Sequence, residues 1–159
     1  MVTLILVFSG LLGAAVGSFL NVCIYRMPRE GLSVSRPRRS FCPGCGAGIA
    51  WHDNIPVVSW LVLGGRCRAC RAPISSRYVL VEILAAALFV LVARRFLLPE
   101  LSVEGFAVIA VLVSALVVAS FIDLELRTIP DEITIRGMMA APLAATLVPG
   151  LHTRPGGTV

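Results

Sequence analysis

The sequence predicts an all-α polytopic membrane protein with about four transmembrane helices, and three observations favour this fold class. Hydrophobic residues make up 57% of the 159-residue chain, and the mean hydropathy is +0.89, well above the range of soluble domains. Several apolar runs are about as long as a membrane is thick. Charged residues, only 14% of the chain, cluster between these runs, which is typical of a membrane protein with one sizeable polar loop.

Four apolar runs meet the length of roughly 17–25 residues that a membrane-spanning helix requires. They cover residues 2–25, about 78–98, about 105–122 and about 133–148. The first run is preceded by no basic segment and followed by no clear small-residue cleavage site, so a retained helix is favoured over a signal peptide. Pro142 lies inside the fourth run and predicts a kink there.

Small residues in the first run indicate close helix packing. Gly13 and Gly17 form a GxxxG pattern, which lets two helices approach closely, and we interpret it as packing only. Cys23, in the same run, is interpreted as a small buried hydrophobic residue. No internal repeat is apparent along the chain.

An arginine-rich loop follows the first run. All fourteen basic residues are arginine, and nine of them lie between residues 26 and 77. The positive-inside rule therefore places this loop in the cytoplasm and the N-terminus outside. The same rule accounts for the net charge of +5 better than nucleic-acid binding does, so we expect no nucleic-acid partner. The predicted organisation is a first helix (1–25), a loop domain (26–77) and a membrane domain (78–159).

Two Cys-x-x-Cys pairs in this loop predict a metal site. Cys42 and Cys45 are separated from Cys67 and Cys70 by 21 residues, and two such turns facing each other complete a tetrahedral Cys₄ zinc site. Two disulfides or a redox pair are the alternatives, and a cytoplasmic location disfavours them. Four ligands leave no open position on zinc, so the expected role is structural. His52, between the pairs, is interpreted as a solvated loop histidine.

Four carboxylates appear within ten residues after the third apolar run: Asp123, Glu125, Asp131 and Glu132. Asp123 is predicted to lie at the membrane boundary, where a carboxylate is costly unless it faces protein or water, and such groups are often functional. An ion pair with Arg127, four residues later, is the main structural alternative.

Other acids near membrane boundaries have less specific interpretations. Asp131 and Glu132 follow Pro130 and could begin the next helix, where negative charge is favourable, while Glu125 and Glu132 are otherwise expected to be solvated. Glu82 lies inside the second run, as either a buried hydrogen-bonding partner or part of a site.

Three segments, in order, resemble the prepilin peptidases, a family of membrane aspartyl peptidases. "GSFLNVCIYRMP" (17–28) is similar to the family's N-terminal signature. Residues 42–82, from "CPGCGAG" to "SSRYVLVE", are similar to its double-Cys-x-x-Cys cytoplasmic domain. "IDLELRTIPDEIT" (122–134) resembles the segment that carries the first of two catalytic aspartates. By this motif Asp123 is the catalytic residue, with Asp131, Glu82 and Arg127 as candidates for site support.

The resemblance implies an aspartic-type endopeptidase in the bacterial inner (cytoplasmic) membrane. Its implied substrates are the precursors of type IV pilins and type II secretion pseudopilins, cleaved at the cytoplasmic membrane face. In many members it also implies N-methylation of the new N-terminus from S-adenosylmethionine. Two carboxylates that share a proton can activate water and protonate the leaving amine, whereas one alone cannot.

The chain departs from the family in one motif. The second catalytic aspartate belongs to a Gly-x-Gly-Asp motif, and no such motif occurs in the 159 residues. We therefore expect a fragment, one part of a split gene or a shortened paralogue, and no cleavage by this chain alone. The alternative function is a catalytically incomplete membrane module that binds prepilin or secretion components through its zinc loop.

Overall fold

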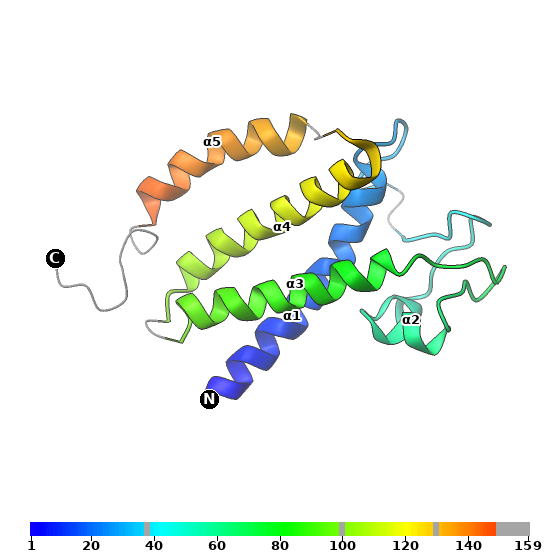
Figure 1. Ribbon diagram of the computed structural model, residues 1–159, viewed down its shortest axis with the longest axis horizontal. Helices are drawn as coiled ribbons and strands as arrows, with labels where there is room; N and C mark the ends of the chain where they lie inside the picture. Colours follow the sequence, from blue (N-terminus) through cyan, green and yellow to red (C-terminus); the bar gives the residue numbers. More distant parts are fainter. Residues whose placement is uncertain (37–38, 99–100, 129–130, 149–159) are drawn as a thin grey trace.

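The computed structural model describes residues 1–36, 39–98, 101–128 and 131–148, and its described part is helical (Figure 1). The only β-type pairings among these residues are isolated bridges in the loop that follows the first helix, so they contain no β-strand. In chain order the elements are α1 (Val2–Arg26), a 3₁₀ turn η1 (Trp51–Asn54), α2 (Val58–Val62), α3 (Arg77–Phe96), α4 (Val103–Leu126) and α5 (Asp131–Leu147).

The four long helices coincide with the four predicted apolar runs, but they differ in how well they suit a membrane. Among the described residues, α1 and α4 are long and apolar enough to cross one. Every 18-residue stretch of α3 contains at least three charged residues, because Glu82 lies near its start and two arginines near its end. Helix α5 has only 17 residues. The helical prediction is therefore confirmed, and two membrane-capable helices are found.

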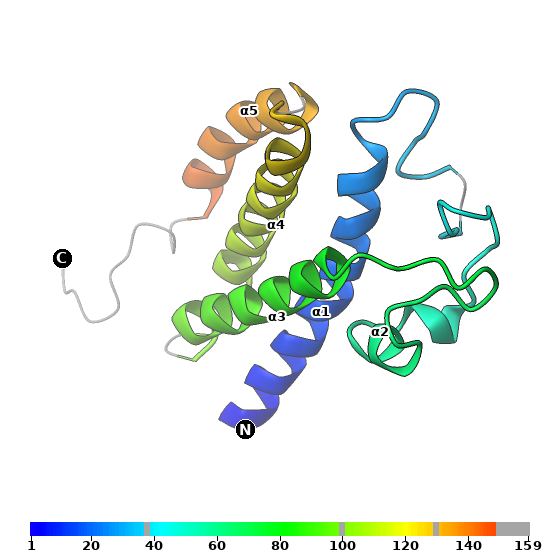
Figure 2. The ribbon, with the colours of Figure 1, turned by 45° about the vertical axis from the view of Figure 1, so that its right-hand side comes forward.

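Helices α1 and α3 form the most extensive contact of the fold. Figure 2 shows them crossing, with α5 folded back beside α4, and α4 contacts both α1 and α3. The buried core between α1, α3 and α4 consists of Leu20, Cys23, Ile24, Val81, Val117, Val118 and Ile122. Cys23 is thus a buried core residue, as predicted.

Close approach of α1 and α3 depends on two glycines. A Cβ atom built on Gly13 would lie 2.7 Å from the Ala85 carbonyl oxygen, and one on Gly17 would lie 2.8 Å from the Glu82 Cα. Both distances are far shorter than van der Waals contact, so only glycine fits. Nearby, the Asn21 Nδ2 group donates a hydrogen bond to the Tyr78 carbonyl (2.9 Å) and joins α1 to the first turn of α3.

The end of α1 anchors the chain that follows. Arg26 is only 4% exposed, and its guanidinium donates hydrogen bonds to the carbonyls of Ser33, Val34 and Arg39. A buried guanidinium must be satisfied by acceptors, and here backbone carbonyls serve. The first arginine of the loop thus holds the loop against the end of the helix.

Candidate functional site

The first Cys-x-x-Cys pair lies on a tight turn. The Cys42 amide donates to the Ala47 carbonyl (2.9 Å), and the Gly46 amide donates back to the Cys42 carbonyl (2.8 Å). Gly46 has a φ of +72°, in the left-handed region that glycine adopts without a Cβ penalty. The turn brings Cys42 and Cys45 to the same side of the loop.

The second pair repeats the same turn 25 residues later. The Cys67 amide donates to the Ala72 carbonyl (2.9 Å), and the Arg71 amide donates back to the Cys67 carbonyl (3.0 Å). Arg71, at φ +60°, occupies the position of the glycine. The flanking bridges, Phe41 with Gly48 and Arg66 with Pro73, show the same offset.

The two turns are therefore a structural repeat, which the sequence analysis did not identify. The signal was present: Cys-x-x-Cys-x-Ala-x-Ile occurs at 42–49 and again at 67–74. The two segments share only four identical residues. The turn geometry requires the cysteines and a residue that can adopt a positive φ, and it places few demands on the other positions.

The four cysteines converge on one point, as predicted. Their Sγ atoms all lie within 4.8 Å of one another, and the Cys42 and Cys70 sulfurs are 3.9 Å apart. Tetrahedral zinc with Zn–S bonds of about 2.3 Å requires sulfur–sulfur distances of about 3.8 Å. All four are free thiols rather than disulfides. The donor set and spacing therefore fit a tetrahedral metal such as zinc.

The thiols differ in their ease of deprotonation. Amide hydrogen bonds from Cys70 and Ala69 lower the pKa of the Cys67 thiol to about 7. At Cys45 the Ala47 amide lowers the pKa, but the neighbouring sulfurs, led by Cys70, together with burial raise it to about 11. Four crowded sulfurs hold protons between them, and a cation at their centre would take the place of those protons.

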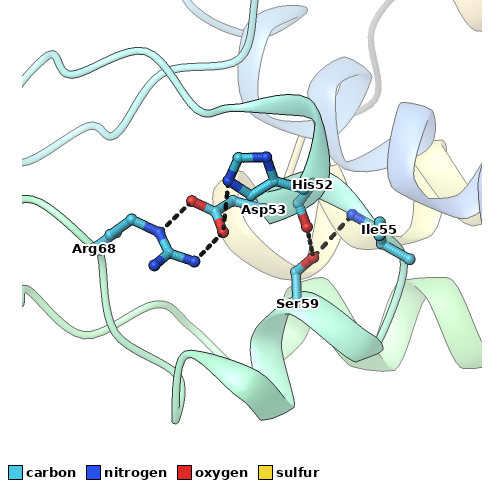
Figure 3. A network of polar contacts seen from close by, with 5 residues as sticks. All are labelled: His52, Asp53, Ile55, Ser59 and Arg68. Carbon is cyan, nitrogen blue, oxygen red and sulfur yellow. Dashed lines mark hydrogen bonds and ion pairs between the residues drawn. The ribbon is translucent and has the colours of Figure 1, made fainter.

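A polar network joins the second turn to η1 (Figure 3). Arg68 lies between Cys67 and Cys70, and its guanidinium donates two hydrogen bonds to the Asp53 carboxylate (2.7 and 2.6 Å). This pairing lowers the pKa of Asp53. His52 has a half-exposed side chain 3.9 Å from Asp53 and is not one of the clustered metal ligands, in agreement with its prediction as a loop histidine.

The Ser59 hydroxyl extends this network to α2. It accepts a hydrogen bond from the Ile55 amide (2.9 Å) and donates one to the His52 carbonyl (2.9 Å), as Figure 3 shows. The hydroxyl, which belongs to α2, therefore satisfies one backbone group inside η1 and one directly after it, and it joins the two elements. The segment between them is fixed by side chains rather than by regular secondary structure.

Glu82 connects the loop to α3. Its side chain is buried, and its Oε2 accepts a hydrogen bond of 2.7 Å from the Val57 amide. Val57 has a φ of +61°, which is a strained conformation for a β-branched residue. The carboxylate thus links the start of α2 to α3, and Glu82 is a buried hydrogen-bonding partner, the first of its two predicted roles. Its role in a site stays a prediction.

Asp123 lies near the end of α4, directly after the fully buried Ile122, and its side chain is exposed. The structural alternative, an ion pair between Asp123 and Arg127, is not found in the described part of the chain. Arg127 adopts a left-handed φ of +55°, and its amide donates to the Asp123 carbonyl (2.8 Å), which ends the helix. This turn carries the guanidinium off the helical i, i+4 path, and the described residues contain no ion pair between the two.

The remaining acids of this cluster occupy different places. Glu125 is exposed, as predicted for a solvated residue, and it also forms an ion pair with Arg77 at the start of α3, which the sequence did not predict. Asp131 is the exposed first residue of α5, where its charge suits the positive end of the helix. The side chain of Glu132 lies outside the described part of the chain.

A cavity of about 680 Å³ lies between the cysteine loop, the end of α1 and the start of α3. Glu82, Arg77, Glu125 and Asn21 are among its lining residues, whereas Asp123 is not. Within the described chain, Asn21 Oδ1 and Arg77 Nε are buried without a hydrogen-bond partner. Such groups are costly to bury, so the wall of the cavity contains buried polar atoms that a bound polar group could satisfy.

Comparison with known proteins agrees with this arrangement. Residues 11–96 match the model of the bacterial peptidase A24 N-terminal domain, which covers α1, the cysteine loop and α3. The chain belongs to the prepilin peptidase family. The family predicted from the three sequence segments is therefore confirmed.

Three curated family members illustrate the similarity, and all three are named prepilin leader peptidase/N-methyltransferase. The Myxococcus xanthus protein is 49% identical over 84% of this chain and 38% of its own length. The Klebsiella pneumoniae protein is 42% identical over 89% of this chain and 64% of its own. The Dichelobacter nodosus protein is 40% identical, over 87% and 56% respectively. The chain thus spans between about two fifths and two thirds of their length. No solved structure matches it.

Proposed function

We propose that this chain is the part of an aspartic-type endopeptidase that supplies the first catalytic carboxylate for cleaving prepilin and pseudopilin leader peptides. The observation that carries the proposal is the exposed Asp123 at the end of a membrane-capable helix in a member of the prepilin peptidase family. Names of related proteins support prepilin processing in general.

The chemistry requires a second carboxylate close to Asp123. One carboxylate takes a proton from water as the water attacks the scissile carbonyl, and the other, protonated, gives its proton to the departing amine. By family resemblance the second comes from a Gly-x-Gly-Asp segment, which the 159 residues do not contain. Asp131, Glu82 and Arg127 are proposed as support. Of these, Asp131 follows Asp123 across the turn between α4 and α5.

The proposed setting is the bacterial inner membrane. Helices α1, α3, α4 and α5 are proposed as spans, with the loop of residues 26–77 in the cytoplasm and residues 78–159 as a membrane domain. The arginine distribution supports this orientation. The charged ends of α3 fit interfacial positions, since arginine side chains can extend to the headgroups.

Zinc is proposed as the metal of the cysteine cluster, in a structural role. Cys42, Cys45, Cys67 and Cys70 would bind it, and zinc would supply a cross-link that fixes the two turns together. With four sulfur ligands the ion has no position for water, so the peptidase step does not use it. N-methylation from S-adenosylmethionine rests on the names of the relatives, and the described residues assign that molecule no site.

A chimaeric enzyme tests the proposal. This chain would replace the matching N-terminal part of the Myxococcus xanthus relative, whose remaining segment would supply the second acid. The chimaera is expected to cleave a prepilin in membranes, and Asp123→Asn is expected to lower the rate by about 10²–10⁴-fold, the usual contribution of a general acid–base group. Glu104→Gln, at the other end of α4, is the matched control and should leave the rate unchanged.

The outcomes separate the candidate functions. Full activity of the Asp123→Asn chimaera would exclude Asp123 as the catalytic residue. A chimaera that folds and does not cleave, together with prepilin binding by the 159-residue chain, would favour the membrane binding module. Cleavage by this chain alone that Asp123→Asn abolishes would mean that another acid, such as Glu82, acts as the partner.

A further inference from the structure

The cysteine loop carries an unexpected apolar surface, which we call the loop patch. It is built from η1, α2 and the residues between them, and its large hydrophobic side chains point outward. Trp51 is 81% exposed and Val62 is 75% exposed. The complete set is Trp51, Ile55, Val58, Leu61 and Val62. Five exposed large hydrophobic side chains within twelve residues are unusual for a polar loop, and such patches mark interaction sites.

The position of the loop patch relative to the proposed membrane span follows from its attachment to α3. The hydrogen bond from the Val57 amide to Glu82 places the start of α2 beside the second turn of α3. Glu82 lies five residues after Arg77, or about 7.5 Å further along the helix at 1.5 Å per residue. Figures 1 and 2 both show α2 near the start of α3. The loop patch therefore lies close to the end of the span that α3 is proposed to form.

The loop patch has apolar neighbours at this depth. On α3, Leu80, Ile83 and Leu84 are also exposed hydrophobic residues near Glu82. A protein-binding patch in water would be expected to end at a polar rim. Here exposed apolar side chains at the same level of α3 belong to the surface that would face lipid.

The charged residues of the loop indicate what kind of surface the loop patch would contact. The loop of residues 26–77 has nine arginines and only two acids, Glu30 and Asp53, and Asp53 is neutralised by Arg68. Arg66 and Arg71, on either side of the second cysteine pair, are both exposed. Exposed apolar residues with a tryptophan, followed by a basic segment, are the combination that binds the boundary between anionic headgroups and acyl chains.

We propose that the loop patch inserts into the headgroup boundary of an anionic membrane, so that the metal loop lies on the bilayer rather than projecting into the cytoplasm. This inference rests on the proposed membrane placement of α1, α3 and α4. It gives the loop a second attachment, to lipid, beside its attachment to Glu82.

Tryptophan quenching tests the proposal in the full chain. The chain is reconstituted in phosphatidylcholine–phosphatidylglycerol vesicles whose acyl chains carry bromine either near the headgroup or near the terminal methyl. The difference in emission between wild type and Trp51→Phe isolates Trp51, because Trp60 is the only other tryptophan. We expect the shallow bromines to quench Trp51 more than the deep ones, and the shallow quenching to decrease when phosphatidylcholine replaces the anionic lipid.

A control on α4 separates this inference from the proposed membrane topology. In the Trp51→Phe background, Val111→Trp places a reporter at an exposed position near the middle of α4, where deep bromines should quench most. Leu61→Trp in the same background gives a second reporter in the loop patch and should match Trp51.

Each outcome decides one part of the proposal. The inference would be overturned if deep bromines quench the α4 reporter while Trp51 and the Leu61→Trp reporter are quenched by aqueous iodide and not by bromines. That outcome would leave the patch as a protein-binding surface in water. An α4 reporter that no bromine quenches would instead overturn the membrane topology. Shallow quenching that is insensitive to anionic lipid would overturn the role of the arginines.

Discussion

Replacement of Gly13 by alanine should force α1 and α3 apart. The added Cβ would lie 2.7 Å from both the Ala85 carbonyl oxygen and the Phe89 Cβ, and 2.8 Å from the Ala86 Cα. Carbon atoms prefer separations of about 3.5–4.0 Å. None of these atoms can rotate away, because two are backbone and the third is a Cβ fixed to it. The helices must therefore separate by roughly 1 Å.

The magnitude follows from two opposing effects. Overpacking of this kind costs about 1–3 kcal/mol. Alanine also gains up to about 1 kcal/mol over glycine from its helix propensity. Gly137→Ala in α5 is the matched control, because nothing lies within 4 Å of its added Cβ. The propensity gain is common to both variants, so the free energies of unfolding of the two variants should differ by about 1–3 kcal/mol.

Reversible unfolding in mixed micelles, followed by tryptophan fluorescence, measures this difference. Gly10→Ala should fall between the two, since its Cβ would lie 3.3 Å from a Val90 methyl group that can move. If Gly13→Ala proved as stable as Gly137→Ala, the close contact of α1 and α3 through these glycines would be incorrect.

Three further predictions concern the loop and its junction with the helices. Purified chain should contain one zinc per chain, and the Cys42→Ser, Cys67→Ser double variant should contain none by metal analysis; unchanged zinc would exclude the Cys₄ site. Arg77→Glu or Glu125→Arg alone should lower stability by about 1–3 kcal/mol, because the ion pair is partly buried, and the double charge swap should restore most of it in a thermal melt. No recovery in the double swap would mean that the pair does not join α3 to α4. Because the pKa of Asp53 is lowered in the folded state, its contribution to stability should be present above about pH 4 and be lost as the pH falls further. The difference in melting temperature between wild type and Asp53→Asn should therefore shrink on acidification, and a constant difference would argue against the Asp53–Arg68 pair.

Sequence patterns determined the helices and the ligand set of this protein. Apolar runs of membrane length require intrahelical hydrogen bonds, so the apolarity and length of the runs predicted α1, α3, α4 and α5 to within about four residues. The sequence also predicted the four cysteine ligands, since two thiolates on one tight turn have few other uses at this spacing. Asp123 was recognised as the candidate catalytic residue from its motif, and its catalytic role remains a prediction.

Only the tertiary structure decided which polar groups meet. The ion pair of Glu125 depends on where α3 begins in space, because its partner Arg77 lies 48 residues before it in the chain. The Asp123–Arg127 alternative fails for a local reason, because the left-handed turn at Arg127 ends the helical spacing on which that pairing depends. The role of Glu82 and the depth of α2 follow from one hydrogen bond across 25 residues. Local sequence fixes periodicity and turn chemistry, whereas the partners of charged groups depend on packing between segments far apart in the chain.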